Sequence, residues 1–261
     1  MVRLYRQQPA AIFTIFALSM EHRPKIEDHT NLTGTGSMFD SIAFRYDFLN
    51  HFLSFGIDRS WRKKAIREIS LLNPHPSKIL DVATGTADLA IAALKLSPDH
   101  ITGIDISEKM LEAGRAKTRR LSPDEKITLL QGDSLKLEFS DEAFDVTMAA
   151  FGVRNFSDSL AGLSEMHRVL RKNGVIMILE FSKPSGKVFR HLYNLYFHKI
   201  LPQIGRFFSK SHFAYSYLPD SVMKFPDNEQ FITLLGKAGF TAVRQKRLTG
   251  GVASIYTGRK I

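Results

Sequence analysis

The sequence predicts an α/β fold built on a largely parallel sheet, and two observations support this prediction. Short runs of aliphatic and β-branched residues recur along the chain, and stretches with helical periodicity separate most of them. Strands that alternate with helices are joined by right-handed crossovers, which makes neighbouring strands parallel. In addition, residues 78–88 pass from an apolar strand through a turn of small residues into an alanine-rich helix, which is typical of nucleotide-binding α/β proteins.

The predicted elements follow from the first helix to the last strand. An amphipathic helix over 61–69 ends at the Asn73-Pro74 break, because proline disfavours helix at the residue before it. Strands are expected at 78–82, 101–105, 127–131, 144–150 and 174–181, and two further strands around 241–247 and 253–258 close the chain. Helices are expected to begin near Thr86, Ser107 (as an N-cap) and Ser157, and a last helix over 227–237 precedes Gly239.

Composition bounds the chemistry. The chain has 261 residues, enough for one large domain with a full core. It contains no cysteine, which excludes disulfides, a thiolate nucleophile and cysteine-based zinc sites; no metal site is expected. The formal net charge is +10, from 36 Lys and Arg against 26 Asp and Glu. This excess suits a polyanion or an anionic membrane surface and does not choose between them.

The chain divides into an N-terminal extension and a main domain. Residues 1–37 are expected to be disordered or to precede the true start, and a membrane-touching anchor is the alternative. Residues 38–261 are expected to form a single domain. An aromatic and basic insertion at 183–225 follows the fifth strand.

The turn after the first strand predicts a nucleoside site. Asp81 ends an apolar strand, the turn Thr84-Gly85-Thr86 follows, and Asp105 ends the next strand. A turn of small residues lets backbone approach a ligand, and the second acid can accept the two ribose hydroxyls. Ala83 and Ala87 stand where a dinucleotide site would carry glycines. With no pyrophosphate to cradle, we expect S-adenosyl-L-methionine as the cofactor and methyl transfer as the reaction.

Further cofactor contacts are expected at the same edge of the sheet. Asp133 and Ser134 follow the third strand, where they can contact the adenine edge, and Asp81 and Asp88 lie where the charged methionine end would bind. Each of these residues has an alternative role that is structural only. The turn would then be an ordinary βα connection, Asp105 would start the following helix, and Asp133 would form a turn. The complete set expected to contact the cofactor is Asp81, Thr84, Gly85, Thr86, Asp105, Ile106, Asp133, Ser134 and Ala150.

The end of the fourth strand indicates which kind of atom is methylated. Amino-directed nucleic-acid methyltransferases carry an Asn/Asp-Pro-Pro-aromatic run here, whereas this chain has Phe151-Gly152-Val153-Arg154-Asn155. It offers no array of acceptors for an amine. A guanidinium stays ionised and donates in two parallel directions, which suits a developing phenolate or enolate oxygen. Arg154 is therefore the first catalytic candidate, with a surface residue before the next helix as the alternative.

These residues also carry a family resemblance. The run 151–155 resembles the Phe-Gly-x-Arg-Asn signature of the UbiE/MenG family of quinone-biosynthesis C-methyltransferases. Residues 38–62, which include Trp61-Arg62, are similar to the family's first motif, and residues 168–182, which include Leu179-Glu180-Phe181, are similar to its second. The likeness covers Met38 to the C-terminus.

The resemblance implies a seven-stranded, mostly parallel sheet with helices on both faces, the Rossmann-like fold of class I S-adenosyl-L-methionine-dependent methyltransferases. It implies ring-carbon methylation of demethylmenaquinol, with ubiquinone intermediates as further substrates in some members. The candidates for moving the acceptor's proton are Tyr46, His51, Asp58 and Tyr215. The chain departs from the family pattern at Ala150, where some members have Ser or Gly, at Asp58, where His is common, and at Lys172-Asn173, where Pro-Gly is usual.

The implied substrate carries an isoprenoid tail, so a transient encounter with a membrane surface is expected. In the insertion, basic residues alternate with aromatic ones, as in segments that lie in a membrane interface; roofing the substrate cavity is the alternative. We expect a cytoplasmic protein at the inner face of the membrane, a possible homodimer and no nucleic-acid partner. A dual menaquinone and ubiquinone role and a non-catalytic cofactor-binding scaffold remain alternatives.

Overall fold

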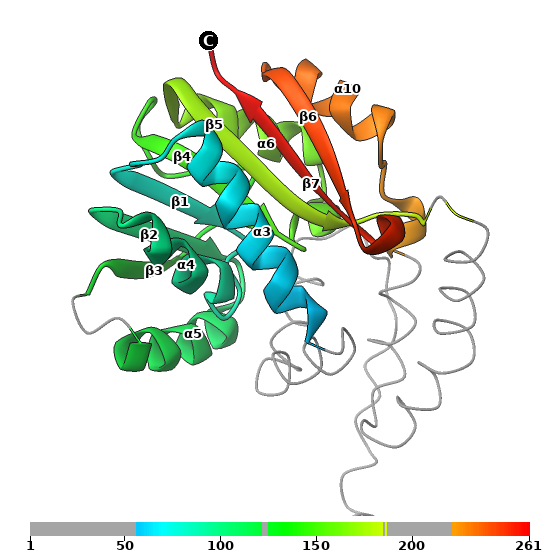
Figure 1. Cartoon of the computed structure of the whole chain (residues 1–261). Helices are drawn as coiled ribbons and strands as arrows, with labels where there is room; N and C mark the ends of the chain where they lie inside the picture. Colours follow the sequence, from blue (N-terminus) through cyan, green and yellow to red (C-terminus); the bar gives the residue numbers. More distant parts are fainter. Residues whose placement is uncertain (1–55, 122–124, 185, 187–220) are drawn as a thin grey trace, which may run out of the picture.

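A computed structural model describes residues 56–121, 125–184, 186 and 221–261. These residues form a seven-stranded sheet in the order β3-β2-β1-β4-β5-β7-β6 (Figure 1). Its strands are β1 (Lys78–Val82), β2 (His100–Asp105), β3 (Ile127–Gln131), β4 (Phe144–Ala150), β5 (Leu170–Phe181), β6 (Thr241–Leu248) and β7 (Ala253–Arg259). β1 to β5 pair in parallel, and β7 runs antiparallel to both β5 and β6. The predicted α/β fold with a mostly parallel sheet is confirmed.

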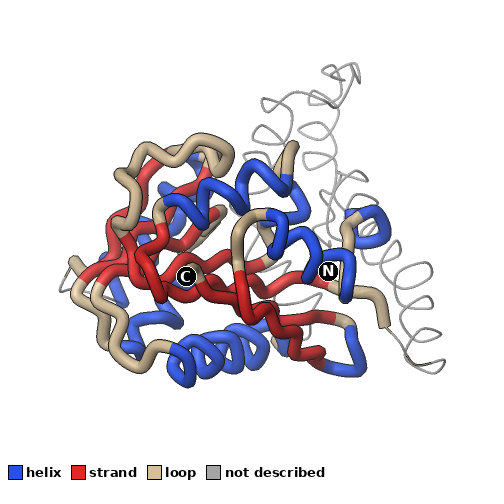
Figure 2. Tube along the Cα trace, turned by 90° about the horizontal axis from the view of Figure 1, so that it is seen from above, coloured by secondary structure: helices blue, strands red, loops and turns tan. Residues whose placement is uncertain are grey.

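Helices cover both faces of this sheet (Figure 2). Three pack on one face: α3 (Ile57–Leu72), α4 (Asp88–Ala93) and α5 (Glu108–Leu121). Two pack on the other: α6 (Ser159–Arg168) and α10 (Glu229–Lys237). β5 shows why both faces need cover, because Val175, Met177 and Leu179 join the first core cluster while Ile176 and Ile178 join the second. Successive side chains of a strand point to opposite faces, so a strand that is apolar throughout is buried on both.

Side-chain caps set two of the helix starts. The Ser107 hydroxyl accepts a hydrogen bond from the Met110 N–H at 3.2 Å, so the predicted N-cap of α5 is confirmed. α6 begins at Ser159, two residues later than the start near Ser157, because the Asp158 carboxylate accepts from the Ala161 N–H at 3.0 Å. β5 begins at Leu170, earlier than predicted, since its pairing with β4 continues past an irregularity in register.

The strand order places a switch point between β1 and β4. From β1 the chain continues outward to β2 and β3, whereas β4 and β5 lie on its other side. The loops that leave β1 and β4 therefore diverge, and ligands of open α/β sheets bind in the crevice between such loops at the carboxyl ends of the strands. Trp61, near the start of α3, packs on Phe151 and Phe181, which follow or end β4 and β5. Thus α3 reaches the same edge of the sheet.

Two parts of the predicted organisation lie outside the described residues, namely the boundary at residue 38 and most of the insertion at 183–225. Within the residues that the structure describes, none of the helices has the length and apolar character needed to span a membrane.

Candidate functional site

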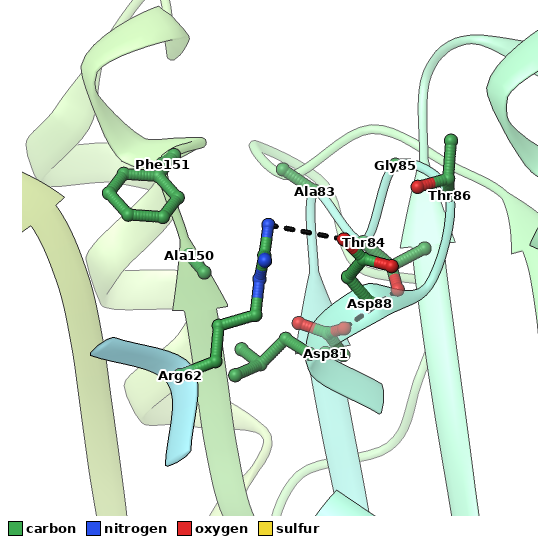
Figure 3. A pocket seen from close by; sticks show the side chains of 10 residues that line it. Arg62, Asp81, Ala83, Thr84, Gly85, Thr86, Asp88, Ala150 and Phe151 are labelled. Carbon is green, nitrogen blue, oxygen red and sulfur yellow. Dashed lines mark hydrogen bonds and ion pairs between the residues drawn. The ribbon is translucent and has the colours of Figure 1, made fainter. Parts of the chain in front are cut away.

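A cavity opens at the switch point between β1 and β4 (Figure 3). One wall is the turn after β1 and the start of α4, and the opposite wall is the end of β4; a side chain of α3 enters between them. The lining residues are Arg62, Asp81, Ala83, Thr84, Gly85, Thr86, Asp88, Leu89, Ala150 and Phe151. Five residues expected to hold the cofactor are therefore brought together here: Asp81, Thr84, Gly85, Thr86 and Ala150.

The turn after β1 has a left-handed backbone at alternate residues. Ala83 has φ 55°, Gly85 φ 55° and Ala87 φ 66°. This conformation costs a non-glycine residue roughly 1–2 kcal/mol, so the two alanines replace glycine in sequence but keep the backbone shape that glycine favours. The turn is held by hydrogen bonds from the Thr84 N–H to the Ile104 carbonyl at 2.8 Å and from the Ala87 N–H to the Thr84 carbonyl at 2.9 Å. Strain maintained in this way is typical of ligand-binding turns.

The loop after β4 packs directly on this turn. A Cβ atom added to Gly152 would lie 2.5 Å from the Ala83 Cβ, closer than van der Waals contact permits. Phe151, just before it, has φ 58° and lines the cavity. The glycine thus lets the two walls approach each other.

Asp81 is a fully buried carboxyl at the floor of the cavity. Its Oδ2 accepts a hydrogen bond from the Thr84 hydroxyl at 2.7 Å, while its Oδ1 has no hydrogen-bond partner among the described residues. Burial raises the pKa of Asp81 from 3.8 to about 7, and the Thr84 hydrogen bond offsets part of that rise. A cationic group arriving in the cavity would favour the ionised form.

Asp105, at the end of β2, holds the turn that lines the cavity. Its Oδ2 accepts from the Gly85 N–H at 2.8 Å and its Oδ1 from the Ser107 N–H at 2.9 Å. An ionised carboxylate has about four acceptor positions, so accepting from backbone N–H groups does not by itself exclude hydroxyl donors. The helix-start alternative and the ribose prediction are thus compatible, and the ribose contact stays a prediction.

The remaining cofactor candidates lie beside the cavity and outside its lining. The Gly132 N–H donates to the Asp105 carbonyl at 3.0 Å, which holds the loop after β3 against the end of β2. In that loop the Asp133 carboxylate accepts from the Leu135 N–H at 2.9 Å, and Ser134 is half-buried. The Ile106 carbonyl accepts from the Gln131 side chain at 3.0 Å. Adenine contacts by these residues remain a prediction.

Two charged residues of the lining, Arg62 and Asp88, belong to a cluster of ion pairs. Asp88 forms ion pairs with Lys117 at 2.7 Å and with Arg62 at 3.3 Å, and the Lys117 ammonium also donates to the Thr86 hydroxyl at 3.1 Å. Arg62 pairs in addition with Asp58, one helical turn earlier, at 2.5 Å. The proton-transfer candidate Asp58 is therefore buried and engaged with a guanidinium.

Arg154 contacts Phe151, which lines this cavity, and the neighbouring Phe181. The Phe151 and Phe181 rings are 4.5 Å apart, and the Arg154 guanidinium lies 5.3 Å from the Phe181 ring. Arg154 forms an ion pair with Glu180 at 2.8 Å and donates to the Phe151 carbonyl; its Nε has no hydrogen-bond partner among the described residues. Its catalytic role stays a prediction. Tyr46, His51 and Tyr215 lie outside the described residues.

Two site residues, Arg62 and Glu180, were missed as functional candidates by reasoning from the sequence. Arg62 lies in the segment that resembles the family's first motif, and Glu180 lies in the segment that resembles the second. Glu180 also interrupts an otherwise apolar strand. That interruption is a signal, because a buried charge requires a partner.

The cavity fits the methionine end of S-adenosyl-L-methionine. That group carries an ammonium and a carboxylate, and the cavity carries two unsatisfied buried polar atoms of opposite kind, Asp81 Oδ1 and Arg62 Nε. Buried polar groups are nearly always paired in proteins, so two unpartnered polar atoms on residues that line one cavity indicate a polar ligand.

Comparison with known proteins agrees with this geometry. The model of the ubiE/COQ5 methyltransferase family matches residues 27–260. The ubiquinone/menaquinone biosynthesis C-methyltransferase UbiE of Geotalea daltonii is 49% identical over 85% of this chain and 94% of its own length. The demethylmenaquinone methyltransferase of Bacteroides fragilis is 42% identical over 91% of this chain and 97% of its own. A solved SAM-dependent methyltransferase from Aquifex aeolicus shares the fold, with a TM-score of 0.53, 18% identity and coverage of 77% of this chain and 89% of that one.

Proposed function

The chain belongs to the ubiE/COQ5 methyltransferase family, and from this premise we propose that it methylates a ring carbon of demethylmenaquinol. Members of this family use S-adenosyl-L-methionine, and the same cofactor is assigned to this chain. The observation that carries the proposal is the buried Arg154–Glu180 pair next to the cofactor cavity: Arg154 donates to the carbonyl of the lining residue Phe151, and its guanidinium lies 5.3 Å from the Phe181 ring.

The chemistry asks two things of the protein. S-adenosyl-L-methionine supplies an activated methyl group on a positively charged sulfur, so no metal is needed to activate it. The chain must hold the acceptor ring in line with that group and favour the ionised hydroquinone, whose negative charge makes the ring carbon nucleophilic. A free phenol has a pKa of about 10, so stabilising its anion by roughly 2–4 kcal/mol makes ionisation practicable near neutrality.

We assign the stabilisation of this oxygen to Arg154. Its side chain is only 6% exposed, and a guanidinium in a poorly hydrated site acts on a nearby anion far more strongly than it would in water. Glu180 fixes the guanidinium through one nitrogen, while Nε has no partner among the described residues. An oxygen that reaches Nε would complete its hydrogen bonding.

Aromatic side chains near Arg154 and the cavity offer a surface for the acceptor ring. The Trp61 ring lies 6.1 Å from the Phe151 ring and 6.2 Å from the Phe181 ring. Offset and edge-to-face contacts at such distances favour a further aromatic ring. Tyr46, His51 and Tyr215 remain the candidates for accepting the proton. Asp58 is a weaker one, since its carboxylate already pairs with Arg62.

The direct test is methyl transfer by the purified protein. The full chain is incubated in detergent with S-adenosyl-L-methionine and chemically reduced demethylmenaquinol. Mass spectrometry then follows methylated quinol and S-adenosylhomocysteine, which should appear in equal amounts. Cofactor binding without methylated quinol would contradict the proposal and favour the scaffold alternative.

A dual role is a second candidate, because the 49% identical relative is named for both ubiquinone and menaquinone biosynthesis. The same assay with a demethylated ubiquinone intermediate as acceptor separates the two roles. Turnover of both acceptors at comparable kcat/KM would establish dual use, and turnover of the menaquinone precursor alone would exclude it.

We propose further that the chain meets its isoprenoid substrate at the inner face of the cytoplasmic membrane, through the aromatic and basic segment 183–225. Flotation with vesicles of anionic and of neutral lipid tests this, because basic segments bind anionic surfaces selectively. Equal flotation with both, or with neither, would count against it. Homodimer formation is tested by light scattering of the purified chain.

A further inference from the structure

Arg62 is a buried cation whose position the proposed reaction does not yet explain. It is carried by α3, yet its guanidinium lies in the cavity between the β1 turn and the end of β4 (Figure 3). Its side chain is 10% exposed. Burying a guanidinium is costly unless anions surround it, so its presence in the cavity calls for a partner of opposite charge.

The resident carboxylates account for only part of its donors. Nη1 pairs with Asp58 at 2.5 Å, whereas Nη2 lies 3.3 Å from Asp88, whose other oxygen is bound more closely by Lys117 at 2.7 Å. Nε has no hydrogen-bond partner among the described residues. Since a guanidinium has five N–H donors in a rigid fork, Arg62 retains the capacity to bind another anion.

The cavity lining narrows what that anion can be. Planar, two-pronged donation by arginine matches a carboxylate or a phosphate. S-adenosyl-L-methionine has no phosphate and a single carboxylate, on its methionine moiety. The acceptors for the neighbouring ammonium are already in the lining, namely Asp88 and the unpartnered Oδ1 of Asp81. The cavity therefore carries opposite charges close together, with Arg62 Nη2 3.3 Å from Asp88, the cation on α3 and the anions on β1 and α4.

We infer that Arg62 binds the α-carboxylate of S-adenosyl-L-methionine and that Asp58 positions the guanidinium for this contact. This inference rests on the cofactor named in the proposed function. Asp58 is buried and stands one turn before Arg62 on the same helix, so the pair is preformed. Because Arg62 belongs to α3 whereas Asp81 and Asp88 belong to β1 and α4, a cofactor that contacts all three ties this helix to the β1 turn.

The test compares two ligands that differ only in the carboxylate, S-adenosyl-L-methionine and its decarboxylated form. Calorimetry measures their affinities for the full chain, with no quinol present. Arg62→Gln should weaken binding of S-adenosyl-L-methionine about tenfold to a hundredfold and that of the decarboxylated ligand by less than about threefold. Arg67→Gln, an exposed arginine on the same helix, is the matched control and should change neither affinity.

Arg62→Gln leaves Asp58 buried without its partner and can destabilise the fold. The double variant with Asp58→Asn and Arg62→Gln removes both charges with little change in shape, and the same ligand discrimination is expected of it. Asp58→Asn alone should weaken binding of S-adenosyl-L-methionine more than binding of the decarboxylated form, because the guanidinium is retained but less well fixed.

Equal losses for both ligands, or no loss for either, would overturn the inference. A raised KM for the quinol with cofactor affinity unchanged would also overturn it and would assign Arg62 to the acceptor. These results leave the proposed reaction intact. Failure of the unmodified chain to bind S-adenosyl-L-methionine at all would overturn both the inference and the proposed function.

Discussion

Arg154 and Glu180 form an ion pair in which both side chains are almost completely withdrawn from water. The guanidinium and the carboxylate are 2.8 Å apart, with 6% and 0% of the two side chains exposed. The second Glu180 oxygen accepts from the Arg154 backbone N–H at 3.3 Å, and the first also accepts from the Phe181 N–H at 2.8 Å. The pair therefore fixes the loop after β4 to the end of β5, and it makes the strand-four arginine a rigid donor.

Removing one partner of this pair should be costly. We expect Glu180→Gln to lower the free energy of unfolding by about 3 kcal/mol, because it leaves Arg154 charged and buried. Asp145→Asn, near the amino-terminal end of β4, breaks a more exposed pair with Arg171 and should cost ~1 kcal/mol or less. Urea unfolding of both variants measures the difference. Similar losses of unfolding free energy in the two variants would show that burial does not make the Glu180 pair more important for stability than the exposed pair.

Arg154 should act on turnover with little effect on cofactor binding. Arg154→Gln is expected to lower kcat by about a hundredfold to a thousandfold, the range observed when a preorganised donor to a developing oxyanion is removed. The affinity for S-adenosylhomocysteine should stay within about threefold, because Arg154 is outside the cavity lining. Arg171→Gln is the matched control. An unchanged kcat in Arg154→Gln would contradict the assigned role.

The close contact between Gly152 and Ala83 should be sensitive to a single methyl group. Gly152→Ala places its Cβ 2.5 Å from the Ala83 Cβ and must displace the β1 turn, which should cost about 1–3 kcal/mol of stability and weaken cofactor binding. Adding Ala83→Gly removes the opposing methyl and should restore much of both. Gly236→Ala, which meets no atom within 4 Å, is the control. If Ala83→Gly does not rescue the variant, the steric explanation is wrong.

Asp81 should make the stability of the fold depend on pH. Its pKa is raised from 3.8 to about 7 in the folded protein, so between these values the folded state holds a proton that the unfolded state has lost. The free energy of unfolding contributed by this group therefore falls as the pH rises from about 4 to 7 and is level above that.

Asp81→Asn removes this dependence. Between pH 5 and pH 8 the unmodified protein should lose roughly 2–3 kcal/mol relative to the variant, since each unit of pKa corresponds to about 1.4 kcal/mol. Denaturant unfolding of both proteins at the two pH values measures the change. A difference that stays constant with pH would mean that Asp81 titrates alike in the folded and unfolded chain.

Local patterns in the sequence were sufficient for the fold and for one wall of the site. Apolar runs of strand length separated by helical patterns located the parallel strands, because burial on both faces leaves continuous apolar runs in residues such as 144–150 and 174–181. Small residues after a strand predicted the turn at 83–87, and the left-handed alanines show that backbone shape, more than residue type, defines it.

What only the tertiary structure decided is which distant charges meet. The sequence places Arg62 on an amphipathic helix and Arg154 after a strand, but strand order and helix packing bring Arg62 to Asp88 and Arg154 to Glu180. The pattern of apolar and polar residues along the chain reflects whether each residue is buried or exposed. An ion pair, or a contact such as that of Gly152 with Ala83, depends instead on the register of elements that are far apart in the chain. The sequence by itself therefore determined that a cofactor cavity follows β1 and which turn forms one of its walls. The packing of α3 and β5 against this cavity decided how its charges are arranged.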